Sequence, residues 1–155
     1  MLRVSRLTDY ATMVLAQMAR EPEAVQTAAD LAELTHLGRP TVSKLLKQLV
    51  RGGLLTSYRG AHGGYVLARP AEAISAAEII DTVEGPMAVT ECSLEDRQCE
   101  LEDVCNVGHH WQRINRAIRS ALEEVTLADL AAPASIPLRR MDLRQAVTGN
   151  ARASG

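Results

Sequence analysis

All three cysteines of the chain lie in one acidic segment. Cys92, Cys99 and Cys105 are spaced C-x6-C-x5-C, and residues 91–105 also contain six carboxylates and a single cation, Arg97. Carboxylates disfavour the thiolate form of a nearby cysteine, so this is a poor setting for a nucleophilic or peroxide-sensing thiol. A bound metal removes the difficulty, because its positive charge stabilises thiolates, and thiolate sulfur is the ligand that iron–sulfur clusters use. The pattern therefore predicts a metal centre.

The spacing favours iron over structural zinc. Zinc sites are usually built on C-x2–4-C pairs, and this chain has none. Three cysteines leave a four-ligand cluster one donor short, so a histidine, a carboxylate or an exogenous group must complete it. Two alternatives stay open: a thiol redox switch without metal, and three cysteines that only pack. Packing is the weaker alternative, since it does not require all the cysteines in a polar loop.

Three helices are predicted ahead of this segment, at residues 7–18, 27–34 and 40–51. Each has apolar residues at helical spacing. Thr27 suits the cap of the second helix, and Gly52 suits the end of the third. Two short helices joined by a tight Gly-containing turn are a candidate helix-turn-helix.

A β-hairpin is predicted directly after the third helix. Residues 54–58 and 65–68 read as two short strands around a Gly-rich tip. A hairpin in this position is the wing of a winged helix, whose tip would lie against DNA. The residues expected to contact DNA are Arg39, Thr41, Ser43, Lys44, Lys47, Gln48 and Arg51 on the helix, and Arg59 and His62 on the wing.

The distribution of charge agrees with this interpretation. Residues 1–70 contain nine Lys/Arg and five Asp/Glu, a net charge of +4, whereas residues 71–155 contain eight and fourteen, a net charge of −6. A basic first half and an acidic second half indicate that only the first half meets a polyanion.

The second half supplies the cysteine loop and a dimerisation surface. Ser75 and Glu78 form a capping box for a short helix that ends at Gly85. A long helix is predicted next, with Trp111, Ile114, Ile118, Leu122 and Val125 on one stripe. A chain this small leaves the stripe little to pack on, so we expect a second subunit to cover it.

We therefore expect a mostly α protein, a winged helix-turn-helix with a small β-hairpin wing and a long C-terminal dimerisation helix. The expected divisions are a DNA-binding domain at 1–85, a cysteine-bearing cluster loop at 86–107, the dimerisation helix at 108–131 and a disordered tail at 132–155.

Several segments together resemble one family. LTDYA, GRPTVSKLLKQLVRGGLL, YRGAHGGY, ISAAEIIDTVEG and the spaced cysteines are similar to the Rrf-type winged-helix regulators of bacteria, a family with IscR-type and NsrR-type members. The resemblance covers about residues 1–130 and points within the family to the regulator of the SUF iron–sulfur assembly system. It implies that the cysteines ligate a cluster, [2Fe–2S] rather than [4Fe–4S], that Pro40–Arg51 is the recognition helix, and that Arg59 is the wing arginine.

The fourth ligand departs from the family pattern. IscR-type members place a histidine three residues after the last cysteine, and here that position is Gly108. His109 lies four residues after Cys105 and would share its helical face, so it ranks first. Asp9 of the partner subunit ranks second, because it matches the carboxylate of nitric-oxide-sensing members. His110 ranks third.

The expected function is that of a homodimeric, cytoplasmic transcriptional regulator that binds double-stranded DNA at a palindromic operator. By resemblance, the cluster-bound form represses iron–sulfur assembly genes. The alternative is a winged-helix regulator that responds to thiol redox state or a metabolite without a cluster. An enzyme is not expected, since the sequence has no Ser/His/Asp, paired-carboxylate or phosphate-loop pattern. No apolar run suits a signal peptide or a membrane span.

Overall fold

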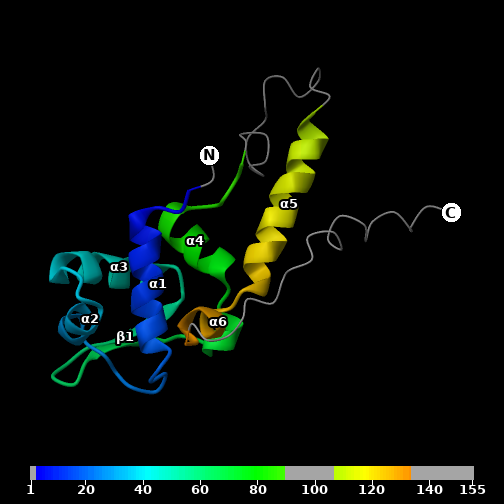
Figure 1. Ribbon diagram of the computed structural model, residues 1–155. Helices are drawn as coiled ribbons and strands as arrows, with labels where there is room; N and C mark the ends of the chain where they lie inside the picture. Colours follow the sequence, from blue (N-terminus) through cyan, green and yellow to red (C-terminus); the bar gives the residue numbers. More distant parts are fainter. Residues whose placement is uncertain (1–2, 90–106, 134–155) are drawn as a thin grey trace.

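The computed structural model describes residues 3–89 and 107–133 (Figure 1). These residues form a mostly helical protein with one two-stranded antiparallel sheet, which confirms the expected fold class. The elements are α1 (Arg6–Met18), α2 (Ala28–Thr35), α3 (Arg39–Arg51), β1 (Leu55–Tyr58), β2 (Gly64–Leu67), the 3-10 turn η1 (Ala71–Ala73), α4 (Ala76–Glu84), α5 (Gly108–Glu124) and α6 (Leu127–Ala131).

Local capping sets the helix starts. Thr27 caps α2 with Asp30 in a complete capping box, and Ser75 does the same for α4 with Glu78. Helix α3 begins at Arg39, one residue before the predicted start, because Gly38 supplies the extended N-cap conformation. The predicted boundaries of these helices therefore hold to within a residue or two.

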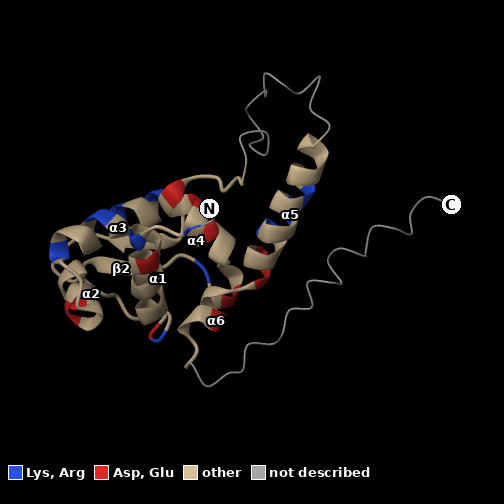
Figure 2. Ribbon diagram, turned by 45° about the horizontal axis from the view of Figure 1, so that its top comes forward, with Lys and Arg blue, Asp and Glu red and all other residues tan. Residues whose placement is uncertain are grey.

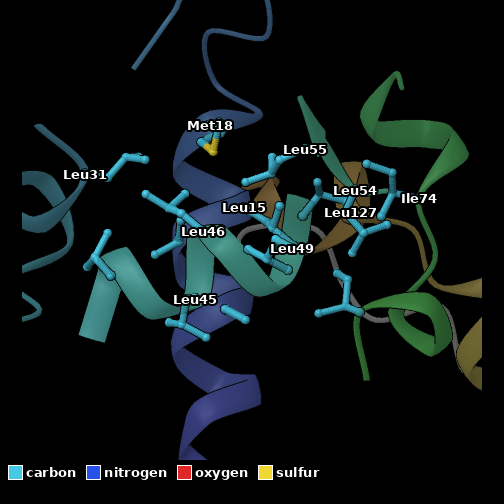
Figure 3. Packing of buried hydrophobic residues seen from close by; sticks show 14 of the residues in the cluster. Leu15, Met18, Leu31, Leu45, Leu46, Leu49, Leu54, Leu55, Ile74 and Leu127 are labelled. Carbon is cyan, nitrogen blue, oxygen red and sulfur yellow. The ribbon is translucent and has the colours of Figure 1, made fainter. Parts of the chain in front are cut away.

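The core lies where α1, α2, α3 and β1 meet. Leu15 of α1 and Leu46 and Leu49 of α3 are fully buried, and Figure 3 shows them packed together between the two helices. The other large buried side chains of this cluster include Met18, Leu31, Leu45, Leu54, Ile74 and Leu127. Burying such side chains contributes about 1.5–3 kcal/mol each, so this cluster holds α3 against α1, α2 and β1. The elements from α1 to α4 are called the winged unit below.

The long C-terminal helix expected over 108–131 is interrupted. Val125 is extended, and Thr126 begins a separate helix, α6, with a capping box to Asp129. The Val125 carbonyl accepts from the Ala76 N–H at 2.8 Å, and the Leu127 N–H donates to Ile74 at 2.7 Å. These bonds, and the full burial of Leu127, tie α6 to the winged unit. Figure 1 shows the start of α5 extending away from that unit, while its end leads into α6.

Helices α3 and α4 approach each other closely at Gly52. A Cβ there would lie 2.7 Å from Thr82 Oγ1, and closer still to the Thr82 methyl group. We expect Gly52→Ala to lower the free energy of unfolding by about 1–3 kcal/mol through this overlap, measured by urea unfolding. The double variant with Thr82→Ala removes the obstructing atoms and is expected to recover most of the loss. Full stability of the single variant would show that the two helices have room to separate.

Candidate functional site

One face of α3 carries three cations. Val42, Leu45, Leu46 and Leu49 bury the inner face, and the exposed Lys44, Lys47 and Arg51 follow one another on the opposite side. Figure 2 shows Lys and Arg positions gathered along this helix. Their spacing of three and four residues places the cations on one strip of the helix surface. Such a strip can contact successive phosphates of a nucleic-acid backbone.

The first turn of α3 is also accessible to solvent. Arg39 is exposed, and Thr41 and Ser43 are half-buried, so all three expected contact residues of this turn keep accessible side chains. The preceding turn places His36 in the left-handed conformation, with φ 55°. This turn joins α2 to α3 as a helix-turn-helix requires.

The wing presents its tip to solvent. Arg59 and His62 are exposed at the tip between β1 and β2, where Gly60 has φ 109° and permits the reversal. The register pairs Tyr58 with Gly64. Tyr58 is 54% exposed beside Arg59, an accessible aromatic that the residue types alone did not single out, although its place next to the arginine was visible in the sequence.

The base of the wing is pinned to the chain before α2. Gln26 and Tyr65 exchange two backbone hydrogen bonds, of 3.0 and 2.9 Å. Gly64 lies against the backbone carbonyl of Gln26 with no room for a Cβ, so only glycine fits there. The wing is therefore held in a fixed direction relative to the helix-turn-helix.

Gln48 differs from the expected DNA contacts. Its Nε2 donates to the backbone carbonyls of Thr82 and Val83, at 3.1 and 2.9 Å, in the last turn of α4. Helical spacing alone placed Gln48 on the outer face of α3 and could not reveal a neighbouring helix end. Because its amide nitrogen is already engaged with α4, we now expect Gln48 to act as an internal contact rather than as a DNA contact.

Cys92, Cys99 and Cys105 lie outside the described residues, so the structure does not test them as ligands. The chain that leads to them is anchored twice. The Met87 N–H donates to Asp81 Oδ1 at 3.3 Å, and the Val89 N–H donates to Oδ1 of the buried Asn115 at 3.2 Å. Met87 is therefore held against α4, and Val89, the last described residue before the cysteines, is held against α5.

The candidates for the fourth ligand are all accessible. His109 and His110 lie exposed in the first turn of α5, and Asp9 lies exposed in the first turn of α1. Figure 1 shows the starts of α1 and α5 at separate places. Over residues 3–89 and 107–133 no group of three or more His, Cys, Asp or Glu side chains could hold a metal.

The start of α1 is tied to the end of α4 through Glu84. Its Oε1 accepts from the Thr8 hydroxyl and, at 2.9 Å, from the Ser5 N–H. These two donors, the hydroxyl first, lower the pKa of Glu84 from its ordinary 4.5.

This network gives a pH dependence. A carboxyl whose pKa is lowered by folding stabilises the fold above its unfolded-state pKa, and the contribution is lost as the pH falls through the folded-state value. We expect wild type to exceed Glu84→Gln in unfolding free energy at pH 7, and the gap to close as the pH falls below 4.5. Urea unfolding from pH 7 to 3 measures the gap, and Glu72→Gln controls for loss of one exposed negative charge. A gap that persists at the lowest pH would contradict this role of the ionised carboxylate.

Helix α5 keeps an apolar strip at its surface. Trp111 is 39% exposed and Ile114 is 43% exposed, and Ile118 and Leu122 on the same strip are half-buried. An exposed apolar strip of this kind is typical of a protein–protein contact. No helix in the described parts of the chain is long and apolar enough to cross a membrane.

Similarities to known proteins agree with this geometry. The Rrf2 family, described as iron-dependent transcriptional regulators, matches residues 4–133. The HTH-type transcriptional regulator ORF2 of Azotobacter vinelandii is 32% identical over 147 residues, 93% of this chain and 89% of its own.

Two solved structures share the fold. CymR, the global cysteine regulator of Bacillus subtilis, has a TM-score of 0.65 at 33% identity over 84% of this chain and 97% of its own. IscR of T. potens has a TM-score of 0.62 at 29% identity, over 88% and 93%. These comparisons do not confirm the expected similarity to a SUF-system regulator.

Proposed function

The chain belongs to the Rrf2 family of transcriptional regulators, and from this we propose that it binds a palindromic operator in double-stranded DNA as a homodimer. The observation that carries the proposal is the strip of exposed cations on α3, Lys44, Lys47 and Arg51, opposite a fully buried inner face. Helix α3 is the second helix of a helix-turn-helix, the element that enters the major groove in such proteins.

Each part of the surface has a distinct role in this proposal. The three cations of α3 and Arg39 neutralise phosphates, which supplies affinity without sequence information. The hydroxyls of Thr41 and Ser43 are short donors and acceptors for base edges. Arg59 at the wing tip enters the minor groove, where the negative potential is strongest.

The apolar strip of α5 and the symmetry of a palindromic operator both support a dimer. The strip headed by Trp111 and Ile114 is covered by the same strip of a second copy, which makes a two-fold interface. Two-fold symmetry places two α3 helices on successive turns of the major groove. Half-sites are then about 10 base pairs apart, centre to centre, or a multiple of that spacing.

The sensing element in this proposal is an iron–sulfur cluster held by Cys92, Cys99 and Cys105. His109 is the first candidate for the fourth ligand, Asp9 of the partner subunit the second and His110 the third. Three thiolates with an imidazole or a carboxylate suit iron, and we expect a [2Fe–2S] rather than a [4Fe–4S] cluster. The occupancy of such a cluster depends on the supply of iron and on oxidants, which would make it a sensing element.

Cluster binding and DNA binding are then linked. If the protein binds DNA differently with and without its cluster, DNA must change its affinity for the cluster by the same factor. By resemblance to the family, the cluster-bound form represses genes for iron–sulfur assembly, and a SUF-type operon is the expected target.

A second candidate function rests on the relatives. CymR of B. subtilis is described as a cysteine regulator, and a structure of Staphylococcus aureus CymR in an oxidized form is 29% identical to this chain. A thiol switch on the same scaffold would use the three cysteines without iron. Metal content separates the two candidates.

Selection of duplexes from a random-sequence pool tests DNA binding and finds the operator in one experiment. We expect the protein to enrich a palindromic site, and light scattering of the complex to give two chains per duplex. Failure to enrich any sequence at low salt would contradict the proposed operator binding.

A further inference from the structure

The last turn of α4 is a junction between three other helices. Gln48 of α3 donates to its carbonyls, Glu84 accepts from the start of α1, and Asp81 pairs with Arg119 of α5 at 2.9 Å. This turn comes directly before the chain that leads to the cysteine segment. It is therefore the place in the described structure where the DNA-binding helix and the approach to the cysteines meet.

The link to α3 is specific and tight. The last carbonyls of a helix have no partner within the helix, and here Gln48 supplies one donor group for two of them, on Thr82 and Val83. One turn further along α3, Gly52 contacts Thr82 with no space for a Cβ. A polar tie and a close steric contact thus fix the same stretch of α3 to the same turn of α4.

The other side of the turn holds the chain before the cysteines. Asp81 accepts from the Met87 N–H through Oδ1 and from Arg119 through Oδ2, so a single carboxylate joins that chain to α5. The Val89 N–H is held by Asn115. A displacement of Met87 must therefore stretch or break its bond to Asp81 in the last turn of α4.

We propose that Gln48 is a positioning residue that transmits the state of residues 85–89 to the DNA-binding face of α3. This rests on the proposed operator binding. Gln48 sets the orientation of α3 relative to α4. This orientation decides whether its neighbours Lys44, Lys47 and Arg51 are aligned with the phosphates of the DNA. The coupling is reciprocal, so DNA bound at α3 must in turn change the stability of the bonds of Met87 and Val89, and we expect it to strengthen them.

Hydrogen exchange measures this coupling directly. The probe is the duplex enriched by the wild-type protein, and the readout is the exchange rate of the Met87 and Val89 amides with and without it, on protein prepared identically. In wild type we expect the duplex to slow exchange at both amides by about fivefold or more, within the usual range of coupling between sites. In Gln48→Met, which keeps the shape but loses the donor, we expect less than about twofold slowing.

Three variants separate positioning from base recognition. Gln17→Met makes the same chemical change on α1 and is expected to retain the wild-type slowing. Gln48→Lys keeps a donor for the two carbonyls and is expected to restore it, whereas a glutamine that reads a base through donor and acceptor together is not replaced by lysine. Should Gln48→Met not fold, Gln48→Asn draws the amide back from both carbonyls and has the same expected outcome.

The outcomes distinguish this inference from the function on which it rests. If wild type enriches no duplex, the proposed operator binding fails. If wild type binds its duplex and Gln48→Met shows the same slowing at Met87 and Val89, operator binding stands and the role of Gln48 is overturned. Loss of slowing in Gln48→Lys as well would also overturn it.

Discussion

Cys99→Ala is expected to purify without iron or acid-labile sulfide and to remain a dimer. Removing the central thiolate of three leaves two, too few to hold a cluster with one further ligand. The buried core of the described residues is built from side chains outside this segment, such as Leu15, Leu46 and Leu127, so we expect the fold to survive. Metal and sulfide analysis of the anaerobically purified variant measures the first effect, and light scattering measures the second.

Ser93→Ala is the matched control for this prediction, because it removes one polar side chain from the same acidic segment and keeps all three thiols. We expect it to retain the iron content of wild type. Two results would contradict the assignment. Wild-type iron in Cys99→Ala would show that Cys99 is not a ligand, and a monomeric Cys99→Ala would show that the segment is structural.

The triple variant Lys44→Ala, Lys47→Ala and Arg51→Ala has the largest effect expected on DNA binding. Each cation that neutralises a phosphate contributes about 0.9 to the slope of log affinity against log salt, so the slope should fall by roughly three. At physiological salt the loss of three such contacts weakens binding by roughly 100-fold. Titration of the selected duplex at several salt concentrations measures both quantities.

The control for charge alone is the double variant Arg20→Ala and Arg116→Ala. Both residues are exposed and lie on α1's C-terminal flank and on α5, away from the α3 strip. We expect this variant to change the salt slope by less than one. An unchanged salt slope in the triple variant would show that α3 is not the DNA-binding surface.

Short-range rules account for most of what the sequence predicts correctly. Thr27 and Ser75 are followed three residues later by acidic residues, and each begins a helix with a complete capping box. Helix α3 is bounded by Gly38 and Gly52, and the glycines of the hairpin permit its reversal. These signals act within a few residues, so they can be read from the sequence without the tertiary fold.

Two features could not be predicted without the tertiary structure. The α5–α6 break depends on the Val125 carbonyl and Leu127 bonding to the chain around Ile74, some fifty residues earlier, although the cap at Thr126 was a readable local signal. The engagement of Gln48 depends on the end of α4 arriving beside α3. Helical spacing describes one helix at a time, and neither contact is local.

The ligand set itself was predicted from residue types and family resemblance and stays a prediction. The structure adds where the accessible donors lie: His109 and His110 at the start of α5, and Asp9 at the start of α1. Figure 1 shows those two helix starts at separate places, and Asp9 stays a candidate contributed by the partner subunit.

The central claim is that the three cysteines hold an iron–sulfur cluster, and anaerobic purification of the wild-type chain tests it most directly. Iron, zinc and acid-labile sulfide are quantified per chain, and the visible absorption spectrum is recorded on the same sample. We expect iron and sulfide in equal amounts with a broad charge-transfer band in the visible region. Colourless protein with zinc or without metal, even after reconstitution with iron and sulfide, would contradict the cluster and favour the thiol switch.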